Sequence, residues 1–112
     1  MKVVFHLNSP DASKKSELLG NMENLKQDER VEIEDMKAIL NSEAITLAFK
    51  NSDASKYVEE CRDKGVDFRI CGNSLENAGK DKQDLVEGVE VVDSGVGELT
   101  ILEEKGYNYI KV

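Results

Sequence analysis

Apolar and polar positions along the chain form blocks that predict strands and helices in turn. Short apolar runs typical of buried strands occupy residues 3–7, 66–71 and 89–92. Another strand is expected within residues 31–40, mainly from 36 to 40, because Val31 and Ile33 alternate with glutamates at its start. Residues 107–112 form the fifth predicted strand.

The segments between these strands carry helix signals. The first helix begins at Ser9-Pro10 or nearer Asp11 and has one apolar stripe. The stripe consists of Leu18, Leu19, Met22 and Leu25. Further helices are expected from residues 41–43 through Phe49, from a break at 51–53 to Lys64 and Gly65, around 75–79, and from Ser94-Gly95 to Lys105-Gly106.

This alternation predicts one α/β domain over residues 1–112, with a mostly parallel sheet of five strands and helices on both faces. A chain of 112 residues can bury a modest core but has no room for an inserted domain. Small α/β domains often cover remaining apolar surface by self-association, so an oligomer is expected.

Charge narrows the set of partners. With 23 acidic and 15 basic residues the formal net charge is −8, which argues against binding nucleic acid or an anionic membrane surface. No apolar run approaches the roughly 18 residues of a membrane span, and the opening residues MKVVFHLNSPD lack a signal-peptide core. We therefore expect a cytoplasmic protein whose two cysteines are thiols.

Candidate chemistry lies beyond the carboxyl ends of the strands, where open parallel sheets bind ligands. These ends are rich in small polar residues, which also serve as helix caps and turns. The candidates are Asn8, Asn41, Gly72, Asn73, Ser74 and Ser94.

Cys71 is the most distinctive of the residues at this edge. It ends a strand before a predicted helix start, where backbone N–H groups and the helix dipole favour thiolate. Asn73 and Glu76 have the spacing of a capping box. A thiolate can accept and pass on sulfur as a persulfide. The alternative is a buried strand cysteine that only packs, and position leaves both open.

Other candidates carry weaker signals. Cys61 shares a helix face with Tyr57 and Val58, which predicts a core stripe. His6 is the single histidine, and a hydrogen-bonded core residue is favoured over a Cys-His pairing with Cys71. One histidine and two separated cysteines predict no metal site.

Several segments together resemble the DsrE/DsrF-like sulfur-relay family, particularly its small stand-alone members. The matching stretches are KVVFHLN, LLGNMENL, VDFRICGNSLE and VVDSGVGELTILEEKGYNYIKV. The resemblance implies a three-layer α/β/α domain with a parallel five-stranded sheet and a homo-oligomer, whether dimer, trimer or hexamer. In relay members a cysteine carries sulfur as a persulfide, and the matching position is Cys71.

The leading hypothesis is therefore a small sulfur-handling protein with Cys71 as the acceptor thiol. Gly72, Asn73 and Ser74 would shape its pocket, and Asn8, Asn41 and Ser94 would line the same edge. Its partners would be sulfur donor and acceptor proteins, with no cofactor beyond the persulfide itself. Two other hypotheses stay open: a module that binds a small anion or nucleotide at these strand ends, and an interaction subunit without chemistry.

Overall fold

Five parallel strands form the central sheet of the protein, described here from a computed structural model that covers all 112 residues. The strands are β1 (Lys2–Leu7), β2 (Asp35–Leu40), β3 (Val66–Cys71), β4 (Glu90–Val92) and β5 (Asn108–Lys111). Their order across the sheet is β4-β3-β2-β1-β5, and each neighbouring pair is parallel. The prediction of a mostly parallel five-stranded sheet is confirmed.

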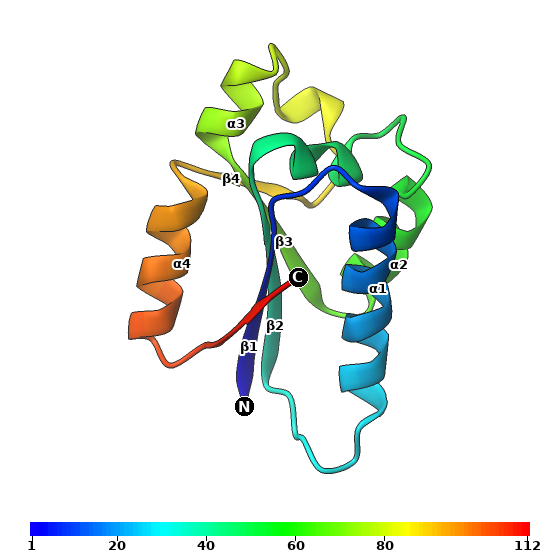
Figure 1. Cartoon of the computed structure of the whole chain (residues 1–112), viewed down its shortest axis with the longest axis vertical. Coiled ribbons are helices and arrows are strands. Elements are labelled where there is room, and N and C mark those ends of the chain that lie inside the picture. Colours follow the sequence, from blue (N-terminus) through cyan, green and yellow to red (C-terminus); the bar gives the residue numbers. More distant parts are fainter.

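The helices form two layers around this sheet. They are α1 (Ala12–Gln27), α2 (Ser55–Asp63), α3 (Gly72–Asn77) and α4 (Gly95–Glu104), with 3-10 turns η1 (Ser42–Ala48) and η2 (Lys82–Asp84). The chain steps outward from β1 to β4 and then returns past β1 to β5. Because parallel crossovers are right-handed, this reversal places α4 on the face opposite α1 and α2 (Figure 1). The fold is a three-layer α/β/α sandwich.

The two faces of the sheet are covered unequally. In β1, Val3, Phe5 and Leu7 point into a core cluster of 21 buried residues under α1 and α2. Val4, on the opposite face, joins a cluster of only 4 buried residues beneath α4. One helix alone therefore covers the second face.

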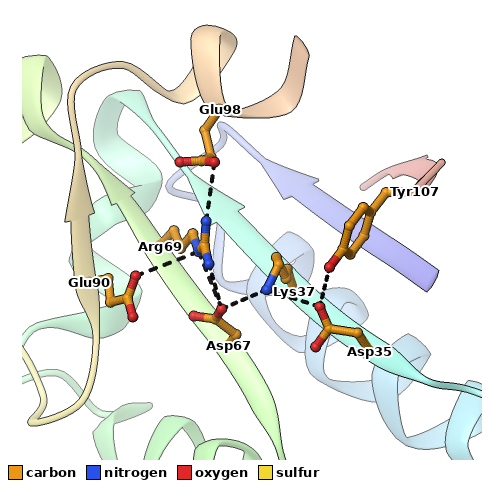
Figure 2. A network of polar contacts seen from close by, with 7 residues as sticks. All are labelled: Asp35, Lys37, Asp67, Arg69, Glu90, Glu98 and Tyr107. Atoms are coloured by element: carbon orange, nitrogen blue, oxygen red, sulfur yellow. Dashed lines mark hydrogen bonds and ion pairs between the residues drawn. The ribbon is translucent and has the colours of Figure 1, made fainter. Parts of the chain in front are cut away.

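Charged side chains occupy much of the face that α4 leaves free. Lys37 on β2 is buried and lies 2.9 Å from Asp35 and 2.8 Å from Asp67 (Figure 2). The Tyr107 hydroxyl donates a hydrogen bond to Asp35. Desolvation alone would lower the pKa of Lys37, but attraction to the Asp67 and Asp35 carboxylates outweighs it, so this pKa is raised above its ordinary value.

Arg69 on β3 extends this network toward α4. Its guanidinium lies 2.9 Å from Asp67, 3.1 Å from Glu98 on α4 and 3.8 Å from Glu90 on β4 (Figure 2). Charged residues alternate with apolar ones in β2 and β3, so the carboxylates and cations share one face. We call the set Asp35, Lys37, Asp67, Arg69, Glu90, Glu98 and Tyr107 the sheet network.

Most predicted elements are confirmed, with shifted ends. Residues 31–34 do not join β2, which begins at Asp35. The helix expected around 75–79 begins earlier, at Gly72, because the chain turns into it directly from β3. The N-cap is therefore Cys71, and the capping box predicted from Asn73 and Glu76 is wrong.

Side-chain expectations for two helices also need correction. Val58 is fully buried and Cys61 packs against the core, but Tyr57 is 59% exposed and leaves the predicted stripe. Asn41 does occupy the N-cap position of η1, yet its side chain makes no capping hydrogen bond. No helix combines the length and apolar character needed to cross a membrane.

The one-sided core gives a stability prediction. Phe68 is 1% exposed beneath α1 and α2, so Phe68→Ala should lower the free energy of unfolding by about 3–5 kcal/mol. Exposed Tyr57→Ala should change it by about 0.5 kcal/mol or less. Urea unfolding followed by circular dichroism measures both, and equal losses would contradict the assigned core.

Candidate functional site

The carboxyl ends of β2 and β3 bring two predicted site residues side by side. Leu40 pairs with Ile70 across these parallel strands, so Asn41 and Cys71 follow as neighbours at the sheet edge. Both strands end there because a 3-10 turn and a helix begin at once. Cys71 falls in alternation with Asp67 and Arg69, on the face beneath α4.

The first residue of α4 packs directly on this pair. A Cβ placed on Gly95 would lie 3.2 Å from Asn41 Cβ and 3.5 Å from Cys71 Cβ. The Ser94 hydroxyl caps the helix by accepting from Gly97 N–H at 3.0 Å. That bond leaves the Gly95 N–H, one of the unpaired donors of the first turn, free to interact with Cys71.

Cys71 is also the N-cap residue of α3. Gly72 starts this helix in close contact with β4, since a Cβ there would lie 2.7 Å from the Val92 carbonyl oxygen. Only glycine fits that approach, and it holds the start of α3 against the sheet. The sulfur of Cys71 is thus surrounded by the first turns of two helices.

These surroundings change the acidity of the Cys71 thiol. Burial opposes ionisation, because the side chain is only 6% exposed. The Ser74 hydroxyl and N–H, followed by the N–H groups of Gly95 and Asn73, favour the thiolate and lower the pKa of Cys71 below its ordinary value.

The lowered pKa has a defined consequence for stability. Because folding depresses this pKa, the Cys71 thiolate contributes stability above the pKa of the unfolded thiol. That contribution is lost as pH falls through the folded value. Cys61 is the opposite case: burial raises its pKa and keeps it a thiol.

Ser74 is oriented toward Cys71 by a strained residue on η1. Its hydroxyl oxygen accepts a hydrogen bond from the Ser42 N–H at 2.7 Å, leaving its own proton to donate. Ser42 has φ of 53°, which is uncommon for a residue other than glycine. A surface cavity of about 400 Å³ between η1 and α3 is lined by Ser42 and Ser74.

Hydrogen bonds between side chains link Asn41 to His6 on β1 and then to Tyr109 on β5. His6 Nε2 lies 3.0 Å from Asn41 Oδ1, and His6 Nδ1 lies 2.7 Å from the Tyr109 hydroxyl. Burial lowers the pKa of His6, so the neutral imidazole donates from Nε2 and accepts from Tyr109. His6 hydrogen-bonds to Asn41 and not to Cys71, in agreement with the hydrogen-bonded alternative.

The remaining predicted residues lie apart from Cys71 or contribute through the backbone. The Asn8 side chain is exposed and accepts from Lys111 Nζ at 3.1 Å, toward the β5 side of the sheet. The Asn73 side chain is exposed, and only its N–H acts on Cys71. The Ser94 hydroxyl serves the α4 cap.

Sequence reasoning missed several groups near this edge. Gly95 was expected only to open a helix, and Tyr109, Arg69 and Glu98 were not singled out. One signal existed: Asp67, Arg69 and Cys71 alternate within VDFRIC, which places charge and thiol on one strand face. No group of three or more metal-ligating side chains is gathered in the structure.

A family model for DsrE/DsrF-like proteins matches residues 1–112, so the chain belongs to the DsrE/DsrF-like family. The resemblance stated above is thereby confirmed, and family membership links the chain to sulfur relay. A search of curated proteins found no match.

Solved structures share the fold. A protein of unknown function, MTH1491 from Methanobacterium thermoautotrophicum, is 34% identical with a TM-score of 0.94, covering 99% of this chain and 98% of that one. The E. coli ychN protein is 18% identical with a TM-score of 0.81, and the match covers 100% of this chain and 99% of that one. BT1422 from Bacteroides thetaiotaomicron, of unknown function, is 18% identical with a TM-score of 0.71, covering 99% and 94%.

Contact between Gly95 and Cys71 gives a testable prediction. Gly95→Ala places a methyl group 3.2 Å from Asn41 Cβ and should push α4 outward. The backbone N–H of residue 95 then interacts less with Cys71, so the pKa of Cys71 should rise. Thiolate ultraviolet absorbance against pH, in a Cys61→Ala background, measures the change. Gly20→Ala, with open space on α1, is the matched control. Equal pKa values in both variants would contradict the contact.

Proposed function

We propose that this protein carries sulfur as a persulfide on Cys71 in sulfur relay, with donor and acceptor proteins as its partners. The observation that carries the proposal is the position of one thiol at the end of β3, where Cys71 is the N-cap of α3 and the first residue of α4, Gly95, packs against it. A cytoplasmic location, where thiols remain reduced, is part of the proposal.

The chemistry requires only a stabilised thiolate. The Cys71 thiolate attacks the outer sulfur of a donor persulfide, R–S–SH. A sulfur–sulfur bond forms to Cys71 while the donor sulfur–sulfur bond breaks, and the donor leaves as the thiolate R–S⁻ with the bonding electrons. The exchange involves no net oxidation or reduction. An acceptor thiolate then removes the outer sulfur by the same step and regenerates the Cys71 thiolate.

The absence of an acid–base partner on Cys71 supports this choice of reaction. His6, the single histidine, is neutral and forms hydrogen bonds with Asn41 and Tyr109. Thiol–persulfide exchange expels a thiolate, which needs no proton from the protein. Cleavage of an ester or amide would need a general acid for a more basic leaving group.

Burial of Cys71 favours a second candidate, an interaction subunit without chemistry. The thiol is only 6% exposed, and Val96 and Ile101 on α4 are 65% and 51% exposed. The two candidates differ in whether a small sulfur donor reaches Cys71 in the folded protein.

Sulfur transfer gives the decisive prediction. Reduced protein incubated with a low-molecular-weight persulfide should gain the mass of one sulfur atom, measured as intact mass under native labelling conditions. Cys71→Ser should lose this gain, and Cys61→Ser, which removes the thiol of raised pKa, should retain it. No gain on the unaltered protein, or equal gain on Cys71→Ser, would sink the proposal.

Self-association is a further part of the proposal, supported by the apolar residues exposed on α4. Ile101→Lys should lower the molar mass in solution if copies associate through α4, because a charge cannot be buried there without a partner. Light scattering coupled to size exclusion measures the mass. Tyr57→Lys, which alters an exposed residue of α2, is the control. A monomeric unaltered protein, or dissociation of the control alone, would contradict the prediction.

A further inference from the structure

Helix α4 is held on the sheet by a small apolar contact. Its buried residues Leu99 and Leu102 join Val4 and Ile39 in a cluster of only 4 residues, against 21 on the opposite face. Leu99 lies at the middle of the helix and Leu102 in its second half, whereas the first residue of its first turn, Gly95, meets the edge that carries Cys71. Apolar packing alone leaves the height and tilt of that first turn weakly fixed.

A polar contact fixes the first turn instead. Glu98 follows the N-cap by one turn, and its N–H donates to the Ser94 carbonyl at 3.0 Å. Its carboxylate accepts from Arg69 Nη1 at 3.1 Å, and both side chains are mostly buried. Figure 2 shows Glu98 reaching from α4 down to the guanidinium on β3.

Arg69 is itself held rigidly by the sheet network. The Asp67 Oδ2 oxygen accepts from Arg69 Nε at 3.2 Å, from Arg69 Nη2 at 2.9 Å and from Lys37 Nζ at 2.8 Å. A planar guanidinium fixed along one edge presents its remaining donors in a defined direction. Arg69 lies two residues before Cys71 on the same strand face, so the anchor for α4 and the thiol share one rigid strand.

We propose that Arg69 and Glu98 are positioning residues, which tie the first turn of α4 to β3 and thereby hold the Gly95 N–H against Cys71. The inference rests on the proposed function in taking Cys71 as the reactive thiol. No hydrogen bond or ion pair joins Arg69 or Glu98 to Cys71, so the pair acts on the thiol through the helix.

A positioning role and a purely electrostatic role of Glu98 predict opposite changes in the pKa of Cys71 when Glu98 is replaced. The titratable or charged groups around this end of the α4 face are His6 on β1, Arg69 on β3, Glu90 on β4, Tyr109 and Lys111 on β5, and Asp93 and Glu98 at α4. Removing the negative charge of Glu98 should lower the pKa of a nearby thiol by Coulomb's law. Loss of the Gly95 interaction should raise it. The direction of the change therefore separates the two roles.

The experiment measures the pKa of Cys71 by thiolate absorbance in a Cys61→Ala background. Glu98→Ala removes the anchor and should raise the pKa by about half a unit, the size of one lost helix N-terminal interaction. Glu98→Gln keeps a neutral acceptor for Arg69 and should leave the pKa at or below that of the parent. Glu104→Ala, which removes the same charge from an exposed position of α4, is the matched control and should have no effect.

Glu98→Asp keeps the negative charge but has a shorter side chain that cannot reach Arg69 as well, so it should also raise the pKa of Cys71. This variant replaces Glu98→Ala in the test if Glu98→Ala does not fold. A pKa that falls or stays constant in Glu98→Ala and Glu98→Asp overturns the inference. The measurement uses no sulfur donor. Failure of Cys71 to accept sulfur would therefore defeat the proposed function without changing the outcome here.

Discussion

The arrangement of this molecule depends on one constraint, the handedness of parallel crossovers. The chain adds β2, β3 and β4 on one side of β1 and then crosses back to place β5 on the other. A right-handed connection allows this return only over the face that α1 and α2 leave open. Helix α4 must therefore begin at the carboxyl edge, above β2 and β3, and its first turn meets Cys71 there. The site is a consequence of the topology as much as of the residues that line it.

The same constraint explains why a charged network lies on a sheet face. A single helix covers too little of that face to bury it with apolar side chains, so β2 and β3 carry Lys37, Asp67 and Arg69 there. Ion pairs of this kind contribute little net stability, since desolvation offsets most of the attraction. Their effect is geometric: each charge has defined partners, and the contact from Arg69 to Glu98 favours one placement of α4. The sheet network thus orders a part of the fold that apolar packing leaves loosely held.

The sequence predicts the elements well because β1 is a short apolar run before turn residues, β3 alternates apolar and charged residues, and Gly65 and Gly106 end helices with positive φ. It also places Cys71 at a strand end beside a helix start. It cannot show that Gly95 rests on Cys71 or that His6 turns toward Asn41, because both depend on register between strands distant in the chain. The start of α3 was missed for a related reason: Gly72 enters the helix at once because Val92 of β4 lies against it. Local patterns do not contain such contacts.

The character of the site follows from what surrounds the thiol. Every group that acts strongly on Cys71 is a fixed donor, either a backbone N–H or the Ser74 hydroxyl that Ser42 orients. Fixed donors stabilise the Cys71 thiolate without moving protons, both before it accepts sulfur and once an acceptor has removed that sulfur again. A general acid or base would add nothing to such an exchange, because both the attacking and the departing group are thiolates. The neutral His6, directed away to Asn41 and Tyr109, fits that requirement. This match between fixed donors and an exchange of thiolates is the physical reason for proposing sulfur transfer at Cys71.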